Sequence, residues 1–348
     1  MKFSFSKEQD MLRRSFVEYL STKCTSEERR KWLESEEGYS MSVWRDISEL
    51  GWPGLIYDEK YGGMSGSFLE MYILCEEIGK SLLPSPLYAS AVLAGMLIDA
   101  AGSEQQKEEY LPDLIEGKRV FTLAYLDRSG GCDAEAPAVS AVPAGNGAYS
   151  LEGVRLFVPY AHAADKMLVC TNVSNHTQTG PTLFMVGAKS AGVNLSSLKT
   201  ISAEKRFAVR LDKVTAKESD IIGEIGKGNA YIQDMLAKAT VLKCAEMLGG
   251  LKQVLDMTVA HVKERHQFGK PLGSFQAIQY YCADMSADLE GGRLLAHQAA
   301  ALLDRGERCY KEVAMAKAWC SDAYPRCCAM SHQIFGAYGF TEECDLHL

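Results

Sequence analysis

The first third of the chain carries the spacing of an amphipathic helix. Apolar residues recur every three or four positions, for example at Leu69, Tyr72 and Ile73, which places them on one helix face. Glycine and proline interrupt this pattern between residues 50 and 66, where a helix does not continue. The pattern predicts a helical bundle with one long loop over residues 1–118.

From residue 119 the period of the apolar positions changes from about four residues to two. Short runs rich in β-branched and aromatic residues cover 120–125, 156–158, 167–170 and 182–186. Turn-forming residues separate them, as in Pro-Ala-Gly-Asn-Gly before Ala148. These runs predict a small all-β domain, a barrel or a sandwich, over residues 119–228.

The helical period returns in the last third. Cys244, Leu248 and Leu251 share one face of a long helix, and Met285 and Leu289 share a face of the next. Long helices joined by short links predict a second bundle over residues 229–348. The expected fold class is therefore α+β, with an N-terminal helical bundle, a central small β-barrel or sandwich, and a C-terminal helical bundle.

Composition excludes several classes of protein. The 348 residues are 47% hydrophobic and 24% charged, which is typical of globular proteins. The 37 Lys and Arg against 45 Asp and Glu give a net charge of −8, so we expect no nucleic-acid partner. The sequence contains no run of about 18 apolar residues, so no membrane span is predicted.

The cysteines and the start of the chain bear on metals and location. Eleven cysteines include no Cys-x-x-Cys pair, and no His-Glu-x-x-His pattern is present, so no metal site is expected. The first ten residues lack the apolar run of a signal peptide and carry acidic residues early. We therefore predict a cytoplasmic protein with reduced cysteines.

Several segments carry motifs that occur in the order of the three predicted parts. The most specific is Glu-Arg-His-Gln-Phe-Gly-Lys-Pro-Leu at 264–272, followed by Phe-Gln-Ala-Ile at 275–278. The others lie at 61–63, 211–228 and 333–343. Together they cover nearly the whole chain and resemble the FAD-dependent acyl-CoA dehydrogenase family, as a divergent bacterial-type member or subunit.

The resemblance implies that FAD is bound by two groups of residues. Arg265, Gln267, Phe268 and Gln276 would contact the diphosphate and adenine side. The FAD of a neighbouring subunit would be contacted by Gln333, Ile334, Gly336, Ala337 and Gly339, which implies an oligomer, commonly a tetramer. The chemistry of Arg265 supports this independently, because a forked cation just beyond a long helix suits a diphosphate.

The predicted β-domain departs from the family pattern at the positions that normally contact the flavin ring. Leu126 lies where a hydroxyl donor often serves the flavin. Phe157, Val158 and Pro159 lie where many members have Trp-x-Thr. An aromatic ring can still flank the flavin, but the Thr hydroxyl is absent and proline has no backbone donor. FAD is still expected, with altered tuning of the flavin.

The catalytic base that the family uses is not found at either usual position. The reaction removes a proton α to a thioester carbonyl and passes a β-hydride to the flavin, so it needs a carboxylate, usually Glu. In most members this Glu lies beyond the segment that ends here at Leu348, and a minority place it at the position of Ala239. Four other acids are not assigned as the base, because ordinary surface, pairing or capping roles explain them: Asp234, Glu246, Glu342 and Glu343.

Three functions remain open. The first is an FAD-dependent acyl-CoA dehydrogenase that gives a 2-enoyl-CoA, in fatty acid or carboxylic acid degradation, with electron-transferring flavoprotein as acceptor. The second is a non-catalytic FAD- or CoA-binding subunit of a heteromeric dehydrogenase. The third is a family member that runs a different acyl-CoA reaction without the usual Glu. The acyl chain, the base and the choice between homo- and hetero-oligomer are not revealed by the sequence.

Overall fold

The computed structural model describes residues 5–127, 139–174, 179–202 and 204–348. The chain folds into two compact units, each described here by itself. The bundle unit comprises Met1–Arg29, Ser67–Leu83 and Ala237–Leu348, and the sheet unit comprises Arg30–Gly66 and Pro84–Leu236. The boundary falls inside two helices, α2 (Ser26–Glu34) and α7 (Gly228–Glu264).

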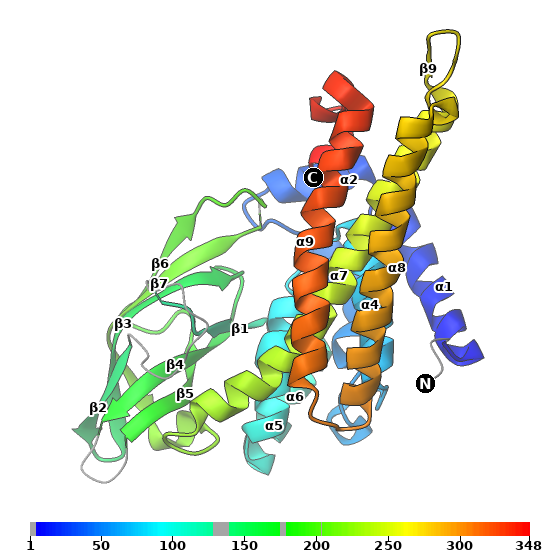
Figure 1. The fold of residues 1–348 in the computed structure, drawn as a ribbon. Coiled ribbons are helices and arrows are strands. Elements are labelled where there is room, and N and C mark those ends of the chain that lie inside the picture. The colour runs from blue at the N-terminus through cyan, green and yellow to red at the C-terminus, as the bar shows by residue number, and fades with distance from the viewer. Residues whose placement is uncertain (1–4, 128–138, 175–178, 203) are drawn as a thin grey trace. The chain divides into compact units, whose positions relative to one another are not determined.

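Long helices build the bundle unit (Figure 1). Besides α7 they are α1 (Lys7–Lys23), α4 (Phe68–Ser81), α8 (Gln276–Asp304) and α9 (Tyr310–Phe335). Helix α8 packs along α9 and against α4, and α1 packs on α4. The unit also contains the hairpin strands β9 (His266–Gln267) and β10 (Lys270–Pro271), with 3₁₀ turns at Leu272–Ser274, Gly336–Phe340 and Asp345–His347.

Local sequence explains where α4 begins. The Ser67 hydroxyl accepts a hydrogen bond from the Glu70 amide, and the Glu70 carboxylate accepts one from the Ser67 amide at 2.9 Å. This reciprocal capping box satisfies two amides that have no partner within the helix. The apolar stripe predicted on this segment is buried, since Tyr72 and Ile73 expose at most 2% of their surface.

Helices α4 and α7 cross at backbone contact. A Cβ atom on Gly79 would overlap the carbonyl of Glu246, and one on Gly249 would overlap the carbonyl of Glu76 and lie 2.7 Å from the Lys80 nitrogen. Neither glycine has a positive φ, so the close approach of the helices, and not backbone conformation, demands glycine there.

The sheet unit holds shorter helices and all of the longer strands. Its helices are α3 (Met41–Glu49), a π-helix (Tyr88–Gly95), α5 (Met96–Ala101) and α6 (Glu104–Ile115), with 3₁₀ turns at Trp52–Gly54, Glu59–Tyr61 and Glu218–Asp220. Its strands are β1 (Phe121–Ala124), β2 (Ser140–Gly145), β3 (Ala148–Pro159), β4 (Lys166–Ser174), β5 (Thr179–Gly187), β6 (Val193–Leu198), β7 (Arg206–Lys217) and β8 (Ile221–Ile222).

The strands form one hydrogen-bonded sheet in the order β6-β7-β3-β2-β4-β5-β8, and β1 pairs in parallel with β4. A single cluster of buried side chains unites its strands, with contributions such as Leu151, Val169, Phe184 and Val209. The buried residues of β3 and β7 alternate with more exposed ones along much of each strand, as the period of two predicts.

The predicted fold class is confirmed. The first and last parts of the sequence are helical and the middle part forms a sheet, which gives a mixed α+β protein. The division at residues 118 and 228 stays a prediction, since the two compact units combine helices from both ends of the sequence. In the described part of the chain, no helix is both long enough and apolar enough to span a membrane.

Candidate functional site

The motif at 264–272 forms a small hairpin at the end of α7. The Arg265 amide donates to the His261 carbonyl at 2.8 Å, and the Leu272 amide donates to the Arg265 carbonyl at 2.8 Å. At the tip, Phe268 has φ +53° and Gly269 has φ +80°. The Phe268 side chain is 89% exposed, so the hairpin presents an aromatic ring to the outside of the bundle unit.

The polar groups of this hairpin are open to a ligand. Within the described residues the Arg265 guanidinium makes no hydrogen bond or ion pair, whereas Gln276 donates to the Tyr280 hydroxyl at 2.6 Å. Gln267 is exposed, and no atom would lie within 4 Å of a Cβ on Gly269. A solvent-facing cation beside an exposed aromatic ring and an open glycine fits the diphosphate and adenine parts of FAD.

The second group of predicted residues lies at the same end of the bundle unit. The His261 ring of α7 stacks on the Phe335 ring of α9 with centroids 4.1 Å apart. The segment that follows Phe335 exposes Gly336 and Ala337, and Gly336 has φ +62° with open space around it. Gln333 is also exposed, whereas Ile334 and Gly339 are buried within their own chain. A ligand could therefore approach this segment at Gln333, Gly336 and Ala337.

In the sheet unit, the residues predicted to flank the flavin ring lie at an irregularity of β3. The register between β3 and β7 shifts between Arg155 and Val158, and Phe157 has φ +53° with 45% of its surface exposed. Val158 is buried, and the carbonyl of the buried Pro159 accepts a hydrogen bond from the Thr122 hydroxyl at 2.7 Å. Phe157 thus presents an aromatic ring, in keeping with a planar ligand.

Leu126 is held beside these residues. Its carbonyl accepts a hydrogen bond from the Leu156 amide at 3.0 Å. Its side chain is partly exposed and offers no polar group. Residues 128–133, which follow shortly after Leu126 in the sequence, lie outside the described residues.

No carboxylate occupies the alternative base position. Ala239 lies on α7 and is 2% exposed. Glu246 forms an ion pair with Lys243 at 2.6 Å, and Asp234, Glu342 and Glu343 are exposed. Among the described residues, no group of three or more His, Cys, Asp or Glu is arranged to hold a metal ion.

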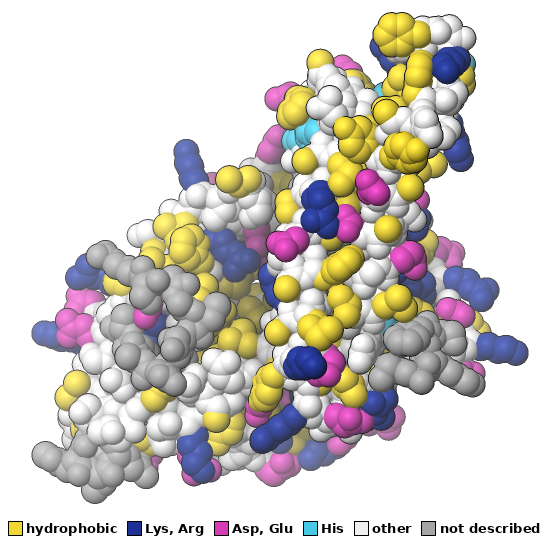
Figure 2. Space-filling view, in the orientation of Figure 1, with side chains coloured by type: hydrophobic (Ala, Val, Ile, Leu, Met, Phe, Trp, Pro, Cys, Tyr) yellow, Lys and Arg dark blue, Asp and Glu magenta, His cyan; other side chains and the backbone are white. Residues whose placement is uncertain are grey.

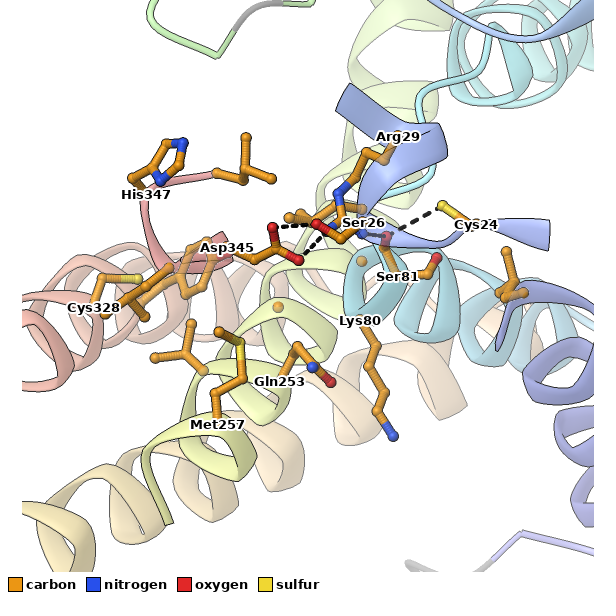
Figure 3. A pocket seen from close by; sticks show the side chains of 18 of the residues that line it. Cys24, Ser26, Arg29, Lys80, Ser81, Gln253, Met257, Cys328, Asp345 and His347 are labelled. Carbon is orange, nitrogen blue, oxygen red and sulfur yellow. Dashed lines mark hydrogen bonds and ion pairs between the residues drawn. The ribbon is translucent and has the colours of Figure 1, made fainter. Parts of the chain in front are cut away.

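The bundle unit also contains a cavity of about 890 Å³ that the sequence did not indicate (Figure 3). Its walls come from α1, the start of α2, α4, α7, α9 and residues 340–348. One side is polar: Arg29 donates to the Asp345 carboxylate at 2.7 Å and to the Ser81 carbonyl at 2.9 Å, and the Ser26 hydroxyl donates to the same carboxylate. The Arg29 Nε atom is buried and has no hydrogen-bond partner among the described residues.

The remaining wall of the cavity is largely apolar. Met257 and Val254 of α7 line it, and the buried Cys24 thiol donates to the Ser81 carbonyl at 3.4 Å. Burial raises the pKa of this thiol, against the opposing effect of the Arg29 charge, so it remains protonated at neutral pH. The Cys24 thiol is therefore not a nucleophile at neutral pH.

Glu77, on the same wall, carries a buried carboxyl whose pKa is raised. Burial is the main cause, the Arg13 guanidinium at 3.0 Å opposes it, and the neighbouring Glu76 adds to it. A carboxyl whose pKa is higher in the folded protein than in the unfolded chain contributes stability at low pH. This contribution is fully present below the pKa of the unfolded chain and is lost as the pH rises through the pKa of the folded protein. Charged Glu77 therefore weakens the fold at neutral pH.

We predict that Glu77→Gln raises the melting temperature relative to the unsubstituted protein, by an amount that grows to a few degrees between pH 4 and pH 7. Thermal unfolding followed by circular dichroism at several pH values measures this difference. Glu18→Gln on exposed α1 removes the same charge and controls for net charge. A difference that stays constant across this pH range would contradict the prediction.

Comparison with known proteins identifies the family of the chain. Residues 6–118 match the acyl-CoA dehydrogenase N-terminal domain, and residues 226–348 match the acyl-CoA dehydrogenase C-terminal domain. The chain is 28% identical over 346 residues to a probable short/branched chain specific acyl-CoA dehydrogenase of Dictyostelium discoideum, covering 98% of this chain and 83% of the relative.

Two further likenesses span nearly the whole chain. The CarC subunit of the caffeyl-CoA reductase-Etf complex of Acetobacterium woodii is 29% identical over 347 residues, which cover 97% of this chain and 90% of CarC. A glutaryl-coenzyme A dehydrogenase in complex with glutaryl-CoA superposes with a TM-score of 0.93 at 28% identity, covering 100% of this chain and 90% of that one. The chain therefore belongs to the acyl-CoA dehydrogenase family of oxidoreductases, which act on CH–CH donors.

Proposed function

We propose that this protein binds FAD and acts on the Cα–Cβ bond of an acyl-CoA thioester, with removal of an α-proton and transfer of a β-hydride to give a 2-enoyl-CoA. The observation that carries the proposal is the hairpin at 265–271, where the unpaired Arg265 and the 89% exposed Phe268 fit the diphosphate and adenine. When bound, FAD supplies the two-electron acceptor that no side chain provides.

The chain's own residues would then bind and orient the cofactor. Arg265 would hold the diphosphate, with Gln267, Phe268 and Gln276 around the adenine side. Phe157 would flank the flavin ring, beside Leu126, Val158 and Pro159. Because Leu126 has no side-chain donor and Pro159 has no amide hydrogen, the ring would receive fewer hydrogen bonds than a Thr at either position allows.

The family relation supports an oligomer in which a second subunit completes the cofactor site. The residues that would reach the neighbour's FAD are Gln333, Ile334, Gly336, Ala337 and Gly339. Apolar side chains are also exposed along α8 and α9 (Figure 2), among them Tyr281, Leu294, Met315 and Trp319. Exposed apolar side chains along two neighbouring helices favour association, and we propose a homo-tetramer or a hetero-oligomer with a related subunit.

The acid–base group is the open part of this proposal. Ala239 cannot accept a proton, and Glu246 is paired with Lys243. One specific observation favours a second function: CarC, similar over 97% of this chain, is a subunit of a reductase complex with Etf. The alternative is therefore a subunit of a heteromeric complex, or a reductive acyl-CoA reaction, with electron-transferring flavoprotein as the electron partner. The cytoplasmic location stays a prediction.

The visible spectrum of the purified protein tests the function first. We expect a yellow protein whose flavin absorption bleaches under anaerobic conditions when one of a panel of saturated acyl-CoAs is added, which also identifies the acyl class. If none bleaches it, the dithionite-reduced protein is titrated with 2-enoyl-CoAs, and re-oxidation supports the reductive alternative. A colourless protein that takes up no added FAD would refute the cofactor assignment.

A further inference from the structure

Arg155 on β3 is a fully buried cation. It is 1% exposed and is one of the largest side chains that the structure buries completely. Its Nε donates to the Cys170 carbonyl at 3.1 Å, its Nη1 donates to the Tyr125 carbonyl at 2.9 Å, and its Nη2 also donates to the Cys170 carbonyl. Among the described residues, no carboxylate lies within ion-pair distance of it.

A guanidinium in such a place is costly. Burial lowers its pKa, and the nearby Cys170 thiol and Asp127 oppose that effect. Burying a charge without an ion-pair partner disfavours folding unless its hydrogen bonds compensate. An apolar side chain of similar length would fill the same space without this cost, so the value of Arg155 lies in the carbonyl groups that it holds.

Those carbonyls lie at a break in the sheet. Strand β4 pairs with β1 up to Val169, which lies opposite Ala124. It pairs with β2 from Asn172 onward, which lies opposite Ser140. Between these two partners, Cys170 is held by the Arg155 guanidinium. The same guanidinium holds Tyr125, the residue that directly follows β1. Arg155 thus links β3, β4 and the end of β1 where no strand continues the ladder.

The residues next to this link are those proposed to flank the flavin ring. Leu126 follows Tyr125, and its carbonyl is bonded to the Leu156 amide, adjacent to Arg155. Phe157 lies two residues beyond Arg155, at the register shift and with φ +53°. Leu126 therefore directly follows a residue that the guanidinium holds, and Phe157 lies two residues beyond Arg155 itself.

We propose that Arg155 is a positioning residue that fixes Leu126 and Phe157 in the geometry needed to receive the flavin ring. The inference rests on the proposed function, because it assumes that FAD is the ligand. Arg155 itself would not contact the ligand, since it is 1% exposed and its Nε, Nη1 and Nη2 atoms each donate to a backbone carbonyl. In a site that has lost the usual hydroxyl donors, a rigid backbone is the remaining means of holding the ring.

The test uses the full-length protein with three substitutions. Arg155→Met keeps the length of the side chain and removes its donors, and Arg155→Lys keeps the charge but loses the planar fork. Arg210→Met is the matched control, because Arg210 is an exposed residue of β7. Hydrogen exchange of the flavin-free protein is measured over residues 121–127 and at Leu156, and FAD affinity and the visible spectrum are measured separately.

We expect Arg155→Met to accelerate exchange of the Leu156 amide, to weaken FAD binding about tenfold and to alter the flavin spectrum of the bound form. For Arg155→Lys we expect an exchange rate and an FAD affinity between those of Arg155→Met and the unsubstituted protein. Arg210→Met should match the unsubstituted protein in both. A purely structural role would lower the melting temperature but leave the spectrum and affinity of the folded fraction unchanged, which would overturn the proposal.

The outcomes separate this inference from the function on which it rests. If the unsubstituted protein binds no FAD, the function fails, while hydrogen exchange still shows whether Arg155 fixes Leu126. If Arg155→Met does not fold, Arg155→Lys decides the question. In that variant, an FAD affinity and a protection of the Leu156 amide equal to those of the unsubstituted protein would refute the inference. Rapid exchange of Leu156 in the unsubstituted protein would refute it without any variant.

Discussion

Gly249→Ala is expected to destabilise the protein by about 3 kcal/mol, although alanine is the better helix former. The added methyl group would overlap the Glu76 carbonyl and lie 2.7 Å from the Lys80 nitrogen. Both are backbone atoms of α4, so no side chain can move aside, and the two helices have to separate. Gly79 makes the reciprocal contact with Glu246, so the whole crossing is displaced. Urea unfolding followed by circular dichroism measures the loss.

The control for this prediction is Gly291→Ala on α8. A methyl group there would meet the Trp319 ring at 2.7 Å, and the ring, which also donates to the Asp288 carbonyl at 2.9 Å, has to shift. Because a side chain and not the backbone of a packed helix is displaced, the loss of stability should be smaller than at Gly249. Equal losses at Gly249 and Gly291 would show that the α4–α7 crossing is not the sensitive contact.

Sequence periodicity predicted the helices better than the strands. The face containing Cys244, Leu248 and Leu251 is buried as expected, with no more than 1% exposed. The π-helix at Tyr88–Gly95 was not predicted, because it differs from an α-helix only in its hydrogen bonding. None of the predicted β-rich runs covers β2, β6, β7 or β8, and β2 and β6 are mostly exposed. A helical face can also mislead: the spacing places Tyr281 on the face of α8 that contains Met285 and Leu289, but Tyr281 is 38% exposed in the single chain.

For the candidate site, the sequence indicated residues that lie together in one local motif and did not indicate residues that are brought together from distant parts of the chain. The hairpin at 264–272 is contiguous, so its tip and its arginine could be predicted. Arg29 and Asp345 are far apart in the sequence, and nothing in either neighbourhood indicates that they form an ion pair beside a cavity. Arg155 stands in a β-rich run, where its burial depends on β1 and β4.

Arg265→Ala is expected to weaken FAD binding on the order of a hundredfold, the effect of losing a charge-assisted, two-pronged contact with a diphosphate. The guanidinium has no partner among the described residues, so its removal breaks no ion pair within the chain. The backbone of Arg265 keeps its hydrogen bonds to His261 and Leu272 in the variant, so the hairpin should persist. Titration of the flavin-free protein with FAD, followed by flavin fluorescence, measures the affinity.

The comparison that decides the role of Arg265 is with Lys263→Ala, which removes another exposed cation two residues earlier on α7. Long-range attraction of an anionic ligand would be reduced about equally by either substitution, and salt would suppress the effect. A direct contact predicts that only Arg265→Ala loses affinity strongly, and that Arg265→Lys recovers part of it, because an ammonium keeps the charge but lacks the fork. Equal affinities for Arg265→Ala and Lys263→Ala would remove Arg265 from the diphosphate site and leave Phe268 and Gln276 without the cation that anchors the cofactor beside them.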